Sequence, residues 1–91
     1  MLILVPEPKR LANLAKHEID MNDFETGFSW DAYLVLPAKR SRTGRVREMY
    51  LGVLHERVVA AIVSPLGTEA ITVVSIRPAS KKERETYAEW Y

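Results

Sequence analysis

Residues 71–87 read ITVVSIRPASKKERETY, and this stretch decides the fold. Its first half is rich in β-branched residues and predicts a buried strand that ends at Arg77-Pro78. Its second half predicts a helix that begins at Ser80. Ser80 and Glu83 have the spacing of a capping box, which satisfies backbone N–H groups at a helix start. A packed strand-to-helix corner therefore carries four cations and one aromatic residue: Arg77, Lys81, Lys82, Arg84 and Tyr87.

Length and composition predict one domain over residues 1–91, with a single core and little margin of stability. The absence of cysteine excludes disulfides and thiolate zinc sites, and the histidines, Asp and Glu residues form no metal-binding motif. We therefore expect no metal and no cofactor. The apolar run at the N-terminus is too short for a signal peptide or a membrane span, so we expect no membrane partner. The lack of cysteine fits a cytoplasmic protein.

Charge is distributed unevenly along the chain. Residues 1–37 hold three basic and six acidic side chains, net −3, whereas residues 38–91 hold ten basic and six acidic ones, net +4. Such asymmetry favours an anionic partner for the second part, although a solvated surface explains it equally well.

The order of the other elements predicts an α+β fold. A strand is expected at 2–5, and a helix with the apolar stripe Leu11, Leu14 and Ala15 follows from residue 7 to about residue 17. Asp20 is expected to cap a second short helix that Gly27 ends. Strands at 30–36, 46–54, 57–63 and 70–77, with a turn at 64–68, complete the pattern. Short connections predict an antiparallel sheet of about four strands, with two short N-terminal helices packed on it and a C-terminal helix.

The loop KRSRTGRVR, residues 39–47, holds five cations and no anion. Gly44 marks a turn within it. One interpretation is a patch that binds the phosphates of RNA or DNA, and the other is a solvated loop. On the first interpretation the expected RNA-binding residues are Lys39, Arg40, Arg42 and Arg45, with Lys81 from the helix.

Two arginines fall on predicted strand faces that are otherwise apolar. Alternation places Arg47 on a face with Met49, and Arg77 on a face with Ile71 and Val73. An arginine on such a face needs a partner, because an unpaired buried charge is costly. A ligand phosphate is one candidate, and the alternative is an internal carboxylate: Glu48, Glu69 or Glu83.

The chain contains no P-loop, GxGxxG motif or nucleophile elbow, so nucleotide-binding and serine-hydrolase functions lack support. His17 is expected at a helix end and His55 in a turn, and neither belongs to a triad pattern. The aromatic residues Tyr87, Trp90 and Tyr91 would serve as core or, if exposed, as platforms for base stacking. Many cations with few histidines suit metal-free RNA cleavage, in which the 2′-hydroxyl attacks its own phosphate and cations stabilise the phosphorane.

Two groups of residues together resemble the BrnT toxin family. The N-terminal group is Lys9, Asn13, Lys16 and His17, followed by Ile19 and Phe24. The C-terminal group is more specific and comprises Ser75, Arg77, Ala79, Glu83, Arg84 and Tyr87. Between them lies a pairing of Arg47 with Gly52.

The resemblance implies a RelE-like fold and a metal-free endoribonuclease toxin of a type II toxin–antitoxin pair, which inhibits translation by cleaving RNA. It also implies a small antitoxin of the ribbon-helix-helix type that binds operator DNA, so that the toxin meets DNA only through it, in a heterotetramer. Arg77 and Arg84 would stabilise the phosphorane, Arg47 would hold the RNA backbone, and Tyr87 would stack a base or join proton transfer.

The chain departs from the family pattern in its scaffold. Ile3-Leu4-Val5-Pro6 replace an aromatic-x-Trp-Asp motif, and Glu18 stands where a glycine usually follows the Lys-His pair. A tight turn at Glu18 must then be made at some strain.

A second hypothesis is a non-catalytic module whose basic face binds an acidic partner or nucleic acid. Replacing Arg77 and Arg84 by Ala would separate the two, because only an enzyme would lose toxicity while keeping its partner.

Overall fold

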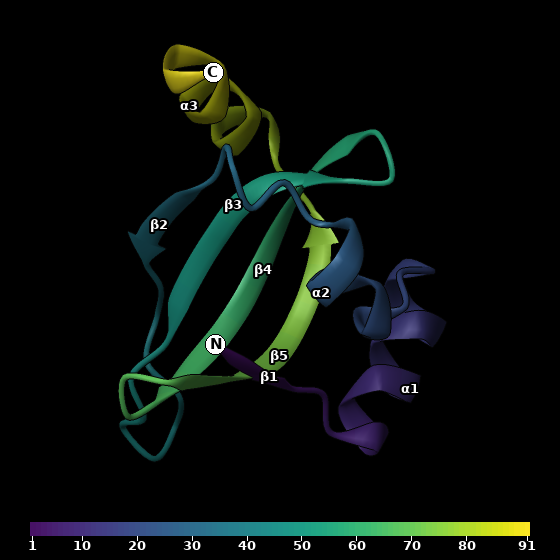
Figure 1. Ribbon diagram of the computed structural model, residues 1–91, viewed down its shortest axis with the longest axis vertical. Helices are drawn as coiled ribbons and strands as arrows, with labels where there is room; N and C mark the ends of the chain where they lie inside the picture. The colour runs from purple at the N-terminus through teal and green to yellow at the C-terminus, as the bar shows by residue number, and fades with distance from the viewer.

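The computed structural model describes all residues from 1 to 91, as a five-stranded sheet with helices on one face and at one end (Figure 1). The N-terminal part consists of β1 (Leu2–Leu4), α1 (Glu7–His17), the 3-10 turn η1 (Met21–Asp23) and α2 (Phe24–Gly27). The rest consists of β2 (Leu34–Pro37), β3 (Glu48–Leu54), β4 (Arg57–Leu66), β5 (Ala70–Pro78) and α3 (Lys81–Trp90). None of these helices is long and apolar enough to cross a membrane.

The sheet is mixed, with the strand order β1-β5-β4-β3-β2. Strands β2 to β5 form the predicted antiparallel meander. The prediction of an α+β fold is confirmed, but the prediction of about four antiparallel strands is wrong. β1 adds a fifth strand and runs parallel to β5, with Leu2 opposite Ala70 and Leu4 opposite Thr72. This pairing joins segments that are far apart in the sequence, which is why no local pattern indicates it.

Two predicted strand boundaries are also wrong. Residues 30–33 are not part of β2, because a hydrogen-bonded turn holds them: Ser29 Oγ donates to the carbonyl of Ala32 (2.9 Å), and Trp30 Nε1 donates to the carbonyl of Glu25 (3.0 Å). Residues 64–66, expected in a turn, extend β4, and the turn begins at Gly67. Pro65 lies opposite Ile71 in the ladder.

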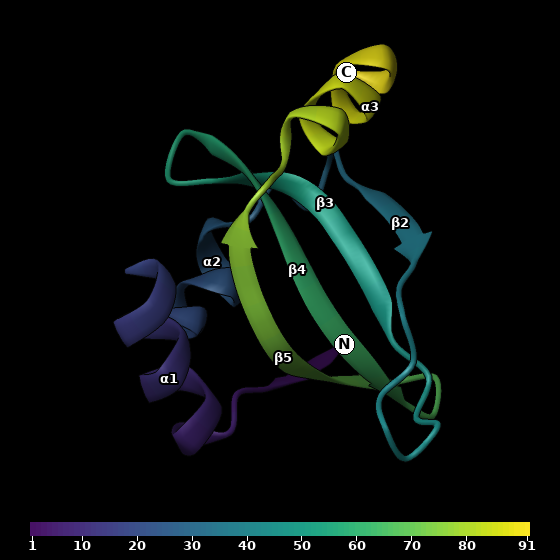
Figure 2. The ribbon, with the colours of Figure 1, turned by 180° about the vertical axis from the view of Figure 1, so that it is seen from behind.

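The main core lies between the sheet and the N-terminal helices, which cover one face (Figures 1 and 2). Met21 and Phe24 are fully buried there. The apolar stripe of α1 does not face this core, since Leu11 is 53% exposed and Leu14 38% exposed. The helix packs instead through Asn13, its one buried residue.

Asn13 closes the part of the β5 edge that β1 does not reach. Its Nδ2 donates to the carbonyl oxygens of Ile76 (3.0 Å) and Ile19 (2.9 Å). Its Oδ1 accepts the backbone N–H of Ile76 (2.9 Å). One amide side chain thus replaces a strand neighbour and fixes α1 against the sheet.

The corner after α1 forms as predicted, without glycine. Glu18 is left-handed (φ 59°, ψ 28°), and its N–H donates to the carbonyl of Leu14. Asp20 then caps η1 by accepting the N–H of Asn22 (2.9 Å). The β3–β4 turn is likewise made by non-glycine residues in the left-handed region, His55 (φ 52°) and Glu56 (φ 64°).

A bulge in β5 decides which way Arg77 points. The ladder pairs Ile62 with Ser75 but Val63 with Val73, so Val74 is an extra residue. An extra residue reverses the alternation of side chains along the strand. Ile71, Val73 and Ile76 therefore belong to the main core, whereas Ser75 and Arg77 lie on the other face. The prediction that Arg77 shares a face with Ile71 and Val73 is wrong for this reason.

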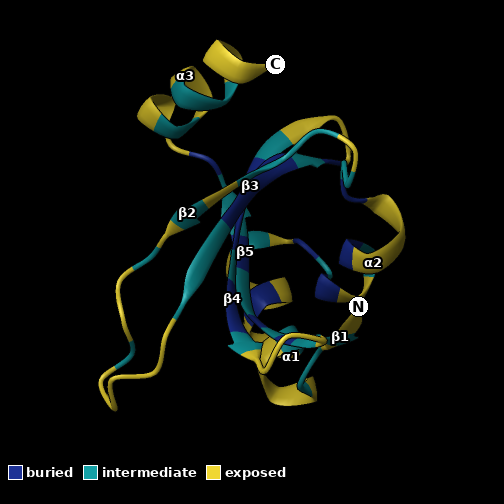
Figure 3. Cartoon of the chain, turned by 60° about the vertical axis from the view of Figure 1, so that its left-hand side comes forward, coloured by how far each residue is buried: buried dark blue, intermediate teal, exposed yellow.

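The second face of the sheet is covered only at one end. A small cluster of Leu51, Ala60 and Ala79 lies there, with Tyr87 of α3 packed against it. Figure 3 shows α3 standing beyond the end of the sheet, with its surface largely exposed. The loop between β2 and β3 extends from the opposite end (Figure 2). The face between α3 and this loop stays open.

Candidate functional site

Two grooves meet along the C-terminal half of β5. The first, here called the helix groove, has a volume of about 360 Å³ and is lined by residues of α1 and β5: Lys9, Ala12, Asn13, Lys16, His17, Val74, Ser75 and Arg77. The second, the sheet groove, has a volume of about 390 Å³ and lies on the open face: Pro37, Ala38, Lys39, Arg47, Met49, Ile62, Val74, Ser75 and Arg77. They share the wall formed by Val74, Ser75 and Arg77, and no carboxylate lines either groove.

Arg77 is held at the shared wall by the capped start of α3. Its Nη1 and Nη2 donate to Glu83 Oε1 (2.7 Å) and Oε2 (2.8 Å). Glu83 Oε1 also accepts the backbone N–H of Ser80 (2.8 Å), and Ser80 Oγ accepts the N–H of Glu83 (3.2 Å). The predicted capping box is confirmed. Glu83 therefore caps the helix and pairs with Arg77 at the same time.

This pair perturbs both of its members. The hydrogen bond from Arg77 is the main cause that lowers the pKa of Glu83 to about 2, with a further contribution from the N–H of Ser80. The hydrogen bond to Glu83 likewise raises the pKa of Arg77. Two of the five guanidinium N–H groups point at the carboxylate, and the side chain remains 35% exposed. Arg77 is thus fixed in orientation and keeps donors for an anion.

Arg47 supplies the second guanidinium, at the other end of the sheet groove. It lies just before β3 and lines the groove together with Met49, as the predicted alternation requires. Its Nε is buried and has no hydrogen-bond partner in the protein. A buried unpaired donor is costly, but the Nη groups of the same guanidinium are not buried and remain available to an anion in the groove.

The helix groove adds charges from the net acidic half of the chain. Lys9, Lys16 and His17 of α1 line it, together with Ala12 and Asn13. The net charges of the two parts of the chain favoured an anionic partner for residues 38–91 and did not indicate that α1 would contribute cations to the site. The signal that identifies these residues is their spacing of i, i+3, i+4, i+7 and i+8, which places them on one helix face.

The other predicted site residues do not line the grooves. Arg84 Nη1 donates to the carbonyl of Ala79 (2.8 Å), and the Tyr87 hydroxyl donates to the carbonyl of Ala32 (2.8 Å). In the loop, Arg40 Nη1 donates to the carbonyl of Gly44 (2.8 Å). Of the five cations in the loop, only Lys39 and Arg47 line the sheet groove. Those outside both grooves are Arg40, Arg42, Arg45, Lys81, Arg84 and Tyr87.

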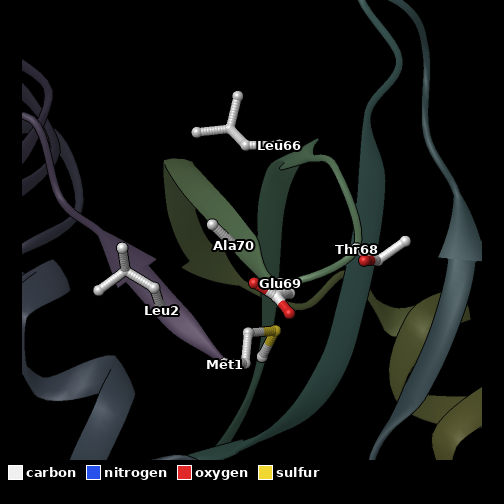
Figure 4. A pocket seen from close by; sticks show the side chains of 6 residues that line it. All are labelled: Met1, Leu2, Leu66, Thr68, Glu69 and Ala70. Carbon is white, nitrogen blue, oxygen red and sulfur yellow. The ribbon is translucent and has the colours of Figure 1, made fainter.

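A third pocket, larger than either groove at about 680 Å³, lies at the end of the sheet away from α3 (Figure 4). Its side chains come from the start of β1, the end of β4 and the turn before β5: Met1, Leu2, Leu66, Thr68, Glu69 and Ala70. It contains no cation and none of the predicted site residues. No three side chains of the His, Asp or Glu type cluster anywhere in the chain in a way that could hold a metal ion.

The chain is similar to known proteins of one family. The model of the BrnT toxin family, described as the ribonuclease toxin BrnT of a type II toxin–antitoxin system, matches residues 6–83. The chain also resembles the 1.1 Å crystal structure of the Brucella abortus ribonuclease toxin BrnT, with 37% sequence identity and a TM-score of 0.70. That similarity covers 89% of this chain and 99% of that chain. No curated protein matches the chain. The resemblance found in the sequence is confirmed: the chain belongs to the BrnT family of ribonuclease toxins of type II toxin–antitoxin systems, whose partner is an antitoxin protein.

Proposed function

We propose that the helix groove and the sheet groove together form the site at which this toxin binds and cuts RNA. The shared wall carries this proposal. An RNA strand that runs from one groove to the other must cross β5 at Ser75 and Arg77. A phosphate at this crossing lies beside Arg77, with Arg47 and Lys39 along one arm of the strand and Lys9 and Lys16 along the other.

The proposed chemistry is metal-independent cleavage through the 2′-hydroxyl. The attack turns one phosphate into a phosphorane that carries an additional negative charge. Fixed cations stabilise this charge better than flexible ones, because they need no reorganisation during the reaction. Arg77 is fixed by Glu83, and the accessible Nη groups of Arg47 can donate to a phosphate in the sheet groove. DNA lacks the 2′-hydroxyl and would be spared.

The contacts of the remaining predicted residues favour supporting roles. Arg84 and Tyr87 tie α3 to Ala79 and Ala32 and so hold the corner that carries Glu83. Lys81 stays on the exposed surface of α3. The loop arginines would meet RNA where it leaves the sheet groove past Lys39, and they are Arg40, Arg42 and Arg45.

Family membership supports finer expectations about the partner. The antitoxin would be a small ribbon-helix-helix protein that binds operator DNA, and toxin and antitoxin would assemble as a heterotetramer. The fold would be of the RelE type, with cleavage of cellular RNA in the cytoplasm as the means of inhibiting translation.

Cleavage of an RNA oligonucleotide in EDTA tests the site. We expect the wild-type protein to cut, and Arg77→Ala and Arg47→Ala each to lower kcat about 10²-fold or more, as loss of one fixed charge donor does elsewhere. Arg57→Ala is the matched control, because Arg57 is an exposed arginine outside both grooves. RNA left intact by the wild type would refute the activity. Full cleavage by both groove variants would refute the site.

The same variants distinguish the enzyme from a binding module. Arg77→Ala combined with Arg84→Ala should abolish toxicity on induction while antitoxin binding is kept. Loss of antitoxin binding alone would instead favour the module.

A further inference from the structure

We propose that His17 is the general base of RNA cleavage, taking the proton from the 2′-hydroxyl beside the scissile phosphate; this inference rests on the proposed function. His17 was expected only as a residue at a helix end, a position that the structure confirms because it is the last residue of α1. The structure adds that its side chain lines the helix groove.

Placement is the first argument. The walls of the helix groove are α1, which carries His17, and β5, which carries Ser75 and Arg77. Arg77 also belongs to the sheet groove, so it marks the crossing point of the strand. A phosphate held by Arg77 brings its adjoining ribose into the helix groove, on the side of His17. The base thus acts from one arm of the site, and Arg47 and Lys39 stabilise the leaving group from the other.

The second argument is the set of titratable side chains that line the two grooves. The titratable and charged groups that face His17 are Lys9 and Lys16 from α1 and Arg77 from β5. The sheet groove adds Lys39 and Arg47, and neither groove has a carboxylate. Lysine and arginine normally carry their protons at neutral pH, so imidazole is the side chain of this site suited to accept one.

The electrostatic setting is the third argument. Partial burial lowers the pKa of His17, and the positive charges of Lys16 and Arg77 lower it further. No hydrogen bond contributes to this shift, and the carboxylate of Glu83 is bonded to Arg77. A ring kept neutral near neutral pH is free to accept a proton.

The step balances without a co-reactant. A ring nitrogen of His17 takes the proton of the 2′-hydroxyl, and the 2′-oxygen forms a bond to phosphorus. The bond from phosphorus to the 5′-oxygen of the next nucleotide breaks, and that oxygen takes a proton from solvent. His17 then returns its proton to solvent. The products are a 2′,3′-cyclic phosphate and a 5′-hydroxyl end.

His55 provides a matched control for the histidine. It lies in the β3–β4 turn, outside both grooves, and its Nε2 pairs with Asp23 Oδ2 at 2.9 Å. The variants to compare are therefore His17→Gln and His55→Gln, which remove the same titrating group from different places.

The test is the pH dependence of cleavage of an RNA oligonucleotide in EDTA. Wild-type kcat should fall as pH drops below the pKa of His17, because a protonated ring cannot accept the 2′-proton. His17→Gln should lower kcat about 10²-fold or more and lose this acid limb. His55→Gln should keep both the wild-type kcat and the acid limb of the pH profile. His17→Gln should still bind, with unchanged Kd, an oligonucleotide with one 2′-deoxy substitution at the cleavage site, which cannot be cut.

A second variant separates chemistry from folding. His17→Ala should regain activity when imidazole is added, whereas His55→Ala should not respond. Intact RNA with the wild type would overturn both the proposed function and this inference. Wild-type cleavage with an active His17→Gln that keeps the acid limb, or a His17→Ala that imidazole does not rescue, would overturn the inference alone.

Discussion

At the scale of single residues, the pairing of Arg77 with Glu83 resolves an ambiguity that spacing left open. Glu83 accepts both the Ser80 N–H and the Arg77 guanidinium. Pairing with Glu83 reduces the net positive charge at the wall that the two grooves share. It also restricts the long side chain of Arg77 to one orientation. For transition-state stabilisation the fixed orientation matters more, because a preorganised donor pays no reorganisation penalty.

Glu83→Gln should change the pH dependence of stability. The folded-state pKa of Glu83 is about 2, against 4.5 for the free group. Its contribution to the free energy of unfolding is therefore present above the free value and lost as pH falls from 4.5 towards 2. We expect a loss of about 1–2 kcal/mol at neutral pH, after allowance for screening of a partly exposed pair. Urea unfolding across this range measures it.

Glu85→Gln is the control for this experiment, since Glu85 is exposed on the same helix. The difference between wild type and Glu83→Gln should vanish near pH 2, where the carboxyl is half protonated or more. An equal loss at both ends of the range would mean that packing, and not charge, is responsible.

Asn13→Ala should be strongly destabilising. The amide satisfies both backbone groups of Ile76 in a buried setting, on a part of the β5 edge that β1 does not reach. Leaving two buried groups unpaired should lower the free energy of unfolding by about 2–4 kcal/mol, measured by chemical denaturation. Asn22→Ala, at an exposed position of η1, should cost far less. Similar losses in both variants would contradict the role given to Asn13.

At the scale of elements, the ends of α1 and β5 decide where the site lies. The left-handed residue Glu18 turns the chain sharply after His17, and Asn13 fixes the helix on β5. The bulge at Val74 turns Arg77 away from the main core. Close packing elsewhere supports these elements, since a Cβ at Gly52 would lie 2.5 Å from Phe28 Cζ.

Glu18→Gly should stabilise the protein. A non-glycine residue in the left-handed region carries a steric cost that glycine does not. We expect the free energy of unfolding to rise by about 1 kcal/mol, measured by thermal or urea unfolding. Glu25→Gly, at an exposed position inside α2, should have the opposite sign because glycine weakens a helix interior. A destabilised Glu18→Gly would show that the Glu18 side chain contributes more than its strain costs.

At the scale of the whole molecule, the fold gathers cations that the chain keeps apart. Lys9 and Lys16 come from residues 1–37, net −3, and meet Arg47 and Arg77 from residues 38–91, net +4. A net charge of +1 therefore conceals a continuous cationic path across one edge of the sheet. Association with a polyanion depends on this local arrangement more than on the net charge.

Lys9→Ala and Lys16→Ala should each weaken the salt dependence of RNA binding. Each phosphate contact that is removed should reduce the slope of log K against log salt by about 0.7 for single-stranded RNA. Binding of an uncleavable oligonucleotide at several salt concentrations measures the slope. Lys82→Ala is the control, because Lys82 lies on α3 outside both grooves. An unchanged slope in the α1 variants would place the RNA elsewhere.

Features that depend on near neighbours in the chain were predictable without the structure. The capping box at Ser80, the start of α1, the Asp20 cap and the meander from β2 to β5 were all predictable, because short-range hydrogen bonds and hydrophobic alternation decide them. The BrnT family was also recognisable, from the spacing of particular residues in the N-terminal and C-terminal parts of the chain.

Features that depend on residues distant in the sequence became visible in the folded chain alone. β1 joins β5 across almost the whole chain, and Asn13 binds Ile76 in place of a strand. One extra residue in β5 moves Arg77 from one face to the other, and nothing in the local pattern marks where that residue is inserted. His17 and Arg77 share a groove because α1 packs on β5. A single-residue change of register or one long-range contact reverses such placements, so the composition of the site follows from packing and not from spacing alone.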